Sequence, residues 1–130
     1  MPPFHQKVIL LCVLILLSGH NVLGTHENII NCLEGNLDLI VHCKSKDDNL
    51  GAHLLHYGET FGWKFQPKVV FGHTVFFCGF TWNGKLHWFD VYDGDYLKDD
   101  CDECIWKIFK SGPCRKEDDG QSTCFLWNKQ

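Results

Sequence analysis

Several features that would place this chain of 130 residues in a broad functional class are missing from its sequence. It has no repeat, no low-complexity tract and no Asn-x-Ser/Thr sequon for N-glycosylation. Basic residues are not in excess, because 16 Asp and Glu outnumber 12 Lys and Arg and give a net charge of -4. An acidic chain has no general electrostatic attraction for nucleic acid or for an anionic membrane, so we expect neither as a partner.

The chain has only one long apolar run, residues 8–17, which is shorter than the roughly 20 residues that a membrane span needs. A segment with Lys7 and no acid precedes this run, and Val22 and Gly24 suit the −3 and −1 positions of a cleavage site. This order is typical of a secretory signal peptide. We therefore predict a signal over residues 1–24, cleavage after Gly24, and one mature secreted domain, 25–130, with no membrane insertion.

Cysteine is abundant, with eight in the chain, of which Cys12 falls in the predicted signal. The others should mostly pair in an oxidising compartment. Their number is odd, so at least one stays free or pairs with another chain. They are Cys32, Cys43, Cys78, Cys101, Cys104, Cys114 and Cys124.

Apolar residues recur with a period of two, which is typical of strands, and no segment has the period of an amphipathic helix. Asn83-Gly84 separates two apolar runs, which is the strongest short signal for a hairpin. Turn residues separate the other runs. The pattern predicts an all-β fold, a small antiparallel β-sandwich stabilised by disulfides. The expected strands are a first one beginning near 29–30, then 37–43, 61–65, 75–82, 86–92, 104–109 and 124–127.

Five blocks in order carry a wider resemblance: 35–51 after Asn31, then 58–65, 74–82, 89–92 and 101–108. Together they resemble the plant self-incompatibility S1 family, the poppy stigma S-protein homologues. The resemblance implies a secreted plant protein folded as a small β-sandwich. It also implies a role like that of the founding members, which are ligands of a pollen plasma-membrane protein and trigger rejection of self pollen.

We therefore expect an extracellular protein recognised by a plasma-membrane receptor or another protein, acting as a monomer, with no cofactor and no catalytic activity. The alternative is a secreted defence or toxin-like effector, also without catalysis. Expression in stigma or another reproductive tissue would favour the first hypothesis, and broad induction by pathogens would favour the second.

The cysteines that the family shares match Cys43, Cys78, Cys101 and Cys104, and we expect these four to form two bridges. Three pairings are possible, and we take Cys43–Cys104 with Cys78–Cys101. Cys32 and Cys124 are candidates for a third bridge between the first and last strands. Cys114 would then be the odd cysteine.

Other motifs have simpler structural interpretations. Cys101-Asp102-Glu103-Cys104 has the spacing of a redox motif, but nearby acids destabilise a thiolate. The histidines show no paired zinc-ligand spacing, and Asp93-Gly94-Asp95 does not follow the calcium-loop order. No Gly-x-Ser-x-Gly elbow is present. We expect no metal site and no catalytic residue.

Recognition by another protein should use exposed loops, because strand residues of a sandwich are tied to packing. Three loops are candidates: 45–51, 93–100 and 115–121. We favour 93–100, which holds four carboxylates and places Tyr92 and Tyr96 beside them, a residue type enriched at binding hot spots. The alternative is that these acids only keep a connecting loop solvated. The candidate residues are Asp93, Asp95, Tyr96, Asp99 and Asp100.

Overall fold

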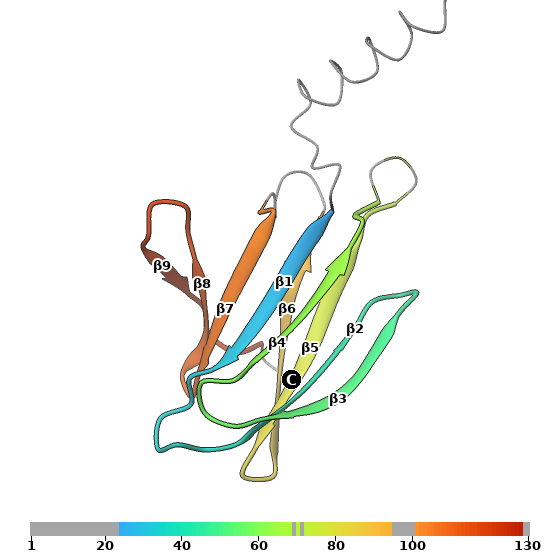
Figure 1. The fold of residues 1–130 in the computed structure, drawn as a ribbon. Helices are drawn as coiled ribbons and strands as arrows, with labels where there is room; N and C mark the ends of the chain where they lie inside the picture. The colour runs from blue at the N-terminus through green and yellow to red at the C-terminus, as the bar shows by residue number, and fades with distance from the viewer. Residues whose placement is uncertain (1–23, 69, 71, 95–100, 129–130) are drawn as a thin grey trace, which may run out of the picture.

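The computed structural model describes residues 24–68, 70, 72–94 and 101–128 (Figure 1). Nearly all of the predicted signal peptide and most of the predicted acidic loop therefore lie outside the described residues. In the part that is described, no helix is long and apolar enough to cross a membrane.

Nine strands form the described domain. They are β1 (Thr25–Asn31), β2 (Leu39–Lys44), β3 (Asn49–Leu55), β4 (Thr60–Phe65), β5 (Val75–Trp82), β6 (Lys85–Asp93), β7 (Glu103–Phe109), β8 (Gly112–Lys116) and β9 (Ser122–Cys124). They make one sheet in the order β4-β1-β7-β8-β9 and a second sheet in the order β3-β2-β5-β6 (Figure 1). The predicted all-β sandwich is confirmed.

One pair of strands departs from the antiparallel expectation. β1 and β7 run parallel, with His26 opposite Glu103 and Asn31 opposite Ile108. Parallel neighbours need a long connection, and here the whole of the second sheet, together with β4, lies between them in the sequence. The first and seventh strands thus hold the centre of the five-stranded sheet together.

The core lies between the sheets and follows the period of two. Along β1 every second side chain is buried, and in β2 the buried side chains are Leu39, Val41 and Cys43. Burying a large apolar side chain stabilises a fold by about 1.5–3 kcal/mol. The large residues of this core include Ile29, Phe76, Phe80, Trp106 and Ile108.

The predicted hairpin at Asn83-Gly84 is confirmed. β5 and β6 pair directly on either side of it, from Trp82 opposite Lys85 to Val75 opposite Asp93. Asn83 has φ 50° and Gly84 has φ 74°. Two positive φ angles are what the tight turn of a two-residue hairpin requires, and Asn-Gly adopts them most easily.

Two strands were not expected from the sequence. β3 begins at Asn49, inside the segment predicted as the loop 45–51. β8 begins at Gly112, where Gly112 and Pro113 suggested an end to strand structure, and it takes in Arg115 and Lys116 of the predicted loop 115–121. Of these two predicted loops, residues 45–48 and 117–121 are the parts that lie outside strands.

The C-terminal segment closes one side of the sandwich instead of extending the last strand. β9 ends at Cys124, and the Phe125 amide donates to the Pro113 carbonyl while the Asn128 amide donates to the Trp88 carbonyl. The segment therefore joins β8 of one sheet to β6 of the other. Gly112, with a positive φ of 150°, has the Phe125 carbonyl where a side chain would stand, so only glycine fits there.

The disulfide partners differ from the predicted ones. The three bonds are Cys43–Cys78, Cys101–Cys104 and Cys114–Cys124. The predicted pairings Cys43–Cys104, Cys78–Cys101 and Cys32–Cys124 are therefore wrong. The four cysteines that the family shares, Cys43, Cys78, Cys101 and Cys104, do form two bonds among themselves. Two of the bonds join residues that face each other across neighbouring strands, Cys43 with Cys78 and Cys114 with Cys124.

Among the described cysteines, Cys32 is the unpaired one, and not Cys114. It is half-buried just after β1, where its amide donates to the Ile108 carbonyl. Burial raises the pKa of its thiol, and the charge of Lys107 partly offsets that rise. The thiolate is thus disfavoured at this position.

Candidate recognition surface

The turn between β2 and β3 presents Asp47 at one end of the sandwich. The Ser45 amide donates to the Asp48 carbonyl at 2.8 Å, and the Asp48 amide donates to the Ser45 hydroxyl at 3.1 Å. These two bonds close the turn, as serine commonly does with its own backbone. The intervening side chains of Lys46 and Asp47 are exposed.

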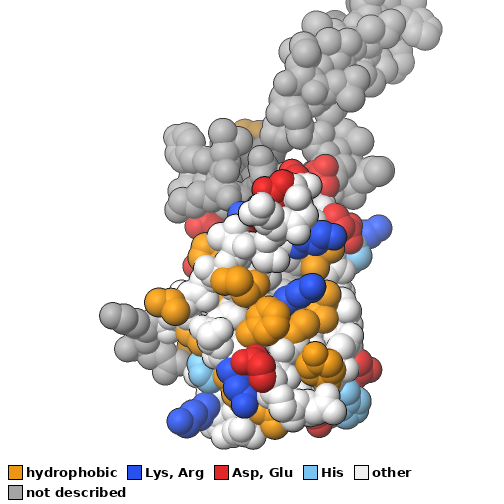
Figure 2. Space-filling model, turned by 90° about the vertical axis from the view of Figure 1, so that its left-hand side faces the viewer, with side chains coloured by type: hydrophobic (Ala, Val, Ile, Leu, Met, Phe, Trp, Pro, Cys, Tyr) orange, Lys and Arg blue, Asp and Glu red, His pale blue; other side chains and the backbone are white. Residues whose placement is uncertain are grey.

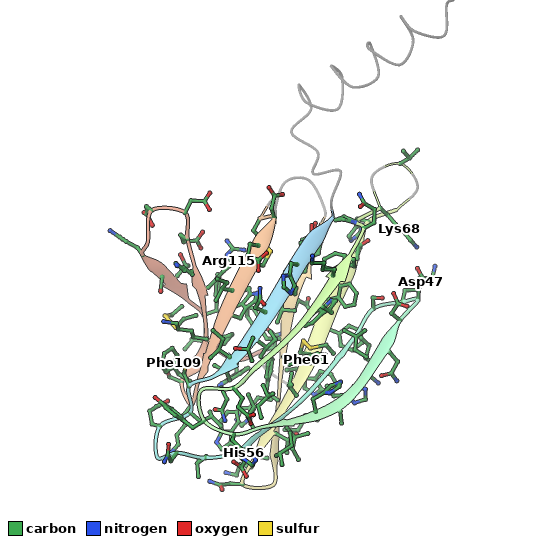
Figure 3. All side chains as sticks on the ribbon, in the orientation of Figure 1. Asp47, His56, Phe61, Lys68, Phe109 and Arg115 are labelled. Atoms are coloured by element: carbon green, nitrogen blue, oxygen red, sulfur yellow. A yellow bond between two sulfur atoms is a disulfide. The ribbon has the colours of Figure 1, made fainter. Side chains whose placement is uncertain are left out.

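A second loop, residues 66–74 between β4 and β5, lies against this turn. Lys68 Nζ forms an ion pair with Asp47 Oδ2 at 2.8 Å, and both residues are labelled at the upper right of Figure 3. The Lys68 amide also donates to the Thr74 hydroxyl at 3.0 Å. Thr74 thus fixes the backbone that carries Lys68, and the ion pair joins the two loops.

The end of β6, where the predicted acidic loop begins, is attached to the same place. The Gly94 amide donates to the Thr74 carbonyl at 2.9 Å. His73 Nε2 lies 3.7 Å from Asp93 Oδ1, and both side chains are partly exposed. Asp93 therefore belongs to the same end of the molecule as Asp47 and Lys68.

Two shallow hollows flank the Asp47–Lys68 ion pair. One has a volume of about 320 Å³ and is lined by His73, Val75 and Phe77 beyond the ion pair. The other, of about 220 Å³, is lined by Lys64, Gln66 and Phe76 on the other side. Small hollows with mixed polar and apolar walls can take single side chains of a protein partner. We call this end, residues 45–48, 66–74 and 93–94, the recognition end.

Two carboxyl groups in and beside the recognition end have pKa values shifted in opposite directions. The hydrogen bond and the positive charge of Lys68 lower the pKa of Asp47 below its usual value. Burial, together with the negative charge of Asp93, raises the pKa of Asp90. Asp47 is thus firmly ionised, whereas the acids along β6 repel one another, which would favour a positive group brought by a partner.

The structure places only part of the predicted site. Asp93 is the last residue of β6 and is half-buried. Asp95, Tyr96, Asp99 and Asp100 lie outside the described residues. Of the three candidate loops, the structure brings the turn of 45–51 and the start of 93–100 to one end.

The third candidate loop is a separate hairpin. Residues 117–121 join β8 to β9, with the Glu117 amide donating to the Gln121 carbonyl and the Gln121 amide donating to Asp119. Cys114–Cys124 fastens this hairpin, and Arg115 Nε donates to Glu117 at 3.1 Å while its guanidinium lies over Trp106. Figure 1 shows it on the opposite flank from the β2–β3 turn.

The flank that carries this hairpin has an apolar surface as well as a charged turn. Figure 2 faces that side of the molecule and shows hydrophobic side chains gathered across its middle. Phe125 and Leu126, which follow β9, are 37% and 83% exposed.

Sequence reasoning missed three residues of the recognition end: Lys68, His73 and Thr74. The sequence suggests His73 only as a zinc ligand, and the other two lie in a loop without unusual composition. Nothing in the local sequence indicates that Lys68 reaches Asp47, because that contact depends on how β4 and β2 come together in different sheets. Locally, the sequence indicates only that Lys68, next to Pro67, lies in an exposed loop.

One cluster in the described domain has side chains close enough to hold a metal ion: Glu27, Cys101 and Cys104. The two sulfur atoms are joined to each other in a disulfide. Glu27 Oε1 accepts a hydrogen bond of 3.0 Å from the Trp106 indole. These groups therefore serve the packing of β1 against β7, and the CxxC spacing is used structurally.

The comparison with known protein families settles what kind of protein this is. The model of the family described as plant self-incompatibility protein S1 matches residues 26–127. The chain belongs to the plant self-incompatibility S1 family. The match spans all nine strands except the first residue of β1, so the family assignment applies to the whole described sandwich.

Relatives within the S1 family are similar over most of their length. S-protein homolog 4 of Arabidopsis thaliana is 43% identical over 77% of this chain and 70% of its own length. S-protein homolog 2 of the same plant is 42% identical over 86% of this chain and 75% of its own length. S-protein homolog 5, also from Arabidopsis thaliana, is 35% identical over 94% of this chain and 98% of its own length.

Proposed function

We propose that this S1-family protein is secreted and acts outside the cell as a ligand that another protein at a plant cell surface recognises. Membership of the family and the three disulfides support an extracellular role, because such bonds persist in oxidising compartments. Recognition of self pollen is the role that the family's founding members suggest.

The observation that carries the proposal is the construction of the recognition end. Two loops from different sheets are joined by the Asp47–Lys68 ion pair, and Thr74 binds both Lys68 and Gly94 through hydrogen bonds. Binding sites are commonly built from loops that a rigid scaffold holds in place. A pre-organised surface loses less conformational entropy when a partner binds.

The charge of this end indicates the partner's chemistry. Asp93 is followed in the sequence by Asp95, Asp99 and Asp100, with Lys98 as the only base among them. Opposite charges across an interface speed the encounter and help to select the partner. We therefore propose that the surface that recognises this end is basic.

A binding role rather than catalysis is also consistent with the histidines. In the described domain, four histidines direct a ring nitrogen at a carboxylate, an Asn side chain or a backbone carbonyl: His26, His42, His53 and His56. None of these contacts is with a hydroxyl or thiol that a base could activate. We propose no catalytic residue.

Secretion is tested by N-terminal sequencing of the protein released from plant cells. The proposal predicts that the mature chain begins at Thr25. A product that keeps residues 1–24 and remains bound to membranes would contradict it.

Recognition is tested by adding the fluorescently labelled mature protein to pollen and to leaf protoplasts. We expect binding that saturates, that unlabelled protein displaces, and that brief protease treatment of the cells abolishes. Binding that never saturates, or that survives the protease, would contradict recognition by a surface protein. Binding to pollen but not to leaf cells would support a reproductive role over a general defence role.

A further inference from the structure

The outer face of the four-stranded sheet is unusually apolar at the end opposite to the recognition end. The strand register places Leu54, Ile40, Thr81 and Leu86 side by side across β3, β2, β5 and β6. Leu54, Ile40 and Leu86 are 55%, 43% and 45% exposed. The outer face of an antiparallel sheet is ordinarily polar, so three exposed apolar side chains in one row across the sheet need an explanation.

The next row of the same face continues the apolar surface. Gly79 lies between His42 and Trp88, and a side chain placed on it would come within 3.0 Å of Leu86 and 3.7 Å of Trp88. These two side chains therefore lean over Gly79. Trp88 also contacts Phe77, with ring centroids 5.9 Å apart. The face is thus covered by packed apolar side chains.

A groove of about 350 Å³ opens at the end of the Leu54–Leu86 row. Leu37, Ile40, Leu54 and Trp82 form its apolar walls, and the β5–β6 turn closes its lower end. The indole of Trp82 is held in place by stacking on His87, with centroids 4.0 Å apart and planes inclined by 4°. A volume of this size suits one long side chain and part of a second.

Asp38 is the one charged residue that lines the groove. Its Oδ1 is bound by His56 Nδ1 at 2.8 Å, and Figure 3 shows His56 at the lower end of the domain, far from Asp47 and Lys68. Within the described residues Oδ2 has no hydrogen-bond partner, and the side chain is 53% exposed. A single negative charge in an otherwise apolar groove complements a positive charge on an apolar stem.

We propose that this groove and the adjoining Leu54–Leu86 row dock a protein segment that presents an arginine next to a leucine. The guanidinium would pair with Asp38 Oδ2 near the Trp82 ring, an arrangement that favours Arg. The leucine would cover Ile40 and Leu54. Since this surface lies at the opposite end from Asp47 and Lys68, a partner at the recognition end leaves it free.

The test is a titration of the isotope-labelled mature protein, followed by NMR, with N-acetyl-Leu-Arg-amide and with its uncharged isostere N-acetyl-Leu-citrulline-amide. We expect the arginine peptide to shift the amides of Ile40, Leu54 and Thr81, and to bind about three- to fivefold more tightly than the citrulline peptide. That ratio is what one solvent-exposed ion pair provides.

Variants separate the charge from the apolar contribution. Asp38→Asn should remove the preference for arginine and leave the affinity for the citrulline peptide unchanged. Leu54→Ser should weaken both peptides alike. Asp118→Asn, which removes an exposed charge from the separate β8–β9 turn, should change neither and is the matched control.

Three outcomes would overturn the proposal. Equal affinity of wild type for the two peptides would show that Asp38 does not receive a cation. Shifts confined to residues outside the groove and row would place the peptide elsewhere. If the same amides shift on raising the concentration of the protein alone, with faster sedimentation, the face binds a second copy of this chain instead.

Discussion

Asn31 shows how one buried polar residue can order several segments. Its side chain donates to the carbonyls of Leu37 at 2.8 Å and Leu55 at 2.9 Å, and accepts from the Leu33 amide at 3.0 Å. It thereby joins the end of β1 to the approach to β2 and to the end of β3. Asn31 also precedes the first of the five sequence blocks that resemble the S1 family.

We predict that Asn31→Ala destabilises the protein by about 3 kcal/mol, because three buried backbone groups lose their partner. The matched control is Asn28→Ala, on the outer side of the same strand, where the side chain donates to the exposed Glu103 and to the Cys104 carbonyl. It should cost about 1 kcal/mol. Urea unfolding measures both, and equal losses would refute the special role of Asn31.

His56 makes stability depend on pH in a defined direction. The hydrogen bond and charge of Asp38, together with the charge of Glu59, raise the pKa of His56 in the folded protein above the ordinary 6.5. Protonated His56 therefore stabilises the fold. This contribution is complete below the unfolded pKa and disappears as the pH rises through the folded pKa.

We predict that both His56→Asn and Asp38→Asn flatten this part of the stability profile. Urea midpoints measured between about pH 5 and pH 8, where histidine titrates, provide the test. His56→Asn should flatten the profile more than Asp38→Asn, because the charge of Glu59 still acts on His56 in the Asp38 variant, and the double variant should behave like His56→Asn. A wild-type profile in which the His56 contribution grows with rising pH would contradict the predicted direction.

At the scale of elements, the disulfides stabilise different parts of the fold. Cys43–Cys78 joins β2 to β5 inside the core and spans 35 residues, whereas Cys114–Cys124 fastens the β8–β9 hairpin and spans 10. A bond that closes a longer loop removes more entropy from the unfolded chain. The core bond should therefore matter more for global stability.

We predict losses of about 4 kcal/mol for Cys43→Ala with Cys78→Ala and about 3 kcal/mol for Cys114→Ala with Cys124→Ala, from the loop-length relation. Urea unfolding gives the two values. Hydrogen exchange should show that the second pair of substitutions loosens mainly β8 and β9. The reverse order of losses would contradict this assignment of the two bonds.

Strands with clear alternation could be predicted from the sequence, and two strands could not. The boundaries of β5 are those of its apolar run, and Asn83-Gly84 specified the β5–β6 hairpin. β3 was not predicted because its sequence is irregular at Gly51, which has φ 76° and lies where the pairing of β3 with β2 shifts. β8 was not predicted because Pro113 ordinarily indicates the end of a strand.

The disulfide partners depend on register, which the sequence does not specify. Cys43 and Cys78 face each other only because β2 pairs with β5 rather than with its sequence neighbour alone. The prediction of the candidate site from the sequence was limited for the same reason. Composition identified Asp93 and the 45–51 segment as exposed, but their nearness depends on the order β2-β5-β6 within one sheet, and the Lys68–Asp47 ion pair depends on how the two sheets pack.

At the scale of the whole molecule, the sandwich separates two surfaces of different character. The recognition end is charged and holds the Asp47–Lys68 ion pair. The opposite end has the apolar groove at Asp38. The C-terminal segment joins the edges of the two sheets, with Trp127 packed on Phe80 and Trp82. This closure fixes the edges of the two sheets relative to each other.

The central claim is that another protein recognises the end of the sandwich from which the acidic loop begins. It is tested most directly by association kinetics on immobilised plasma-membrane vesicles from cells that bind the protein. The test variant is Asp95→Asn with Asp99→Asn and Asp100→Asn. The matched control, Glu117→Gln with Asp118→Asn and Asp119→Asn, removes as many charges from the β8–β9 turn.

We predict that the test variant associates about tenfold more slowly at low salt, with a weaker dependence on ionic strength and little change in dissociation, because steering by opposite charges acts on the encounter. The control should associate like the wild type, and both variants should keep the wild-type unfolding midpoint. An unchanged association rate and salt dependence in the test variant, or equal slowing of the control, would contradict the claim.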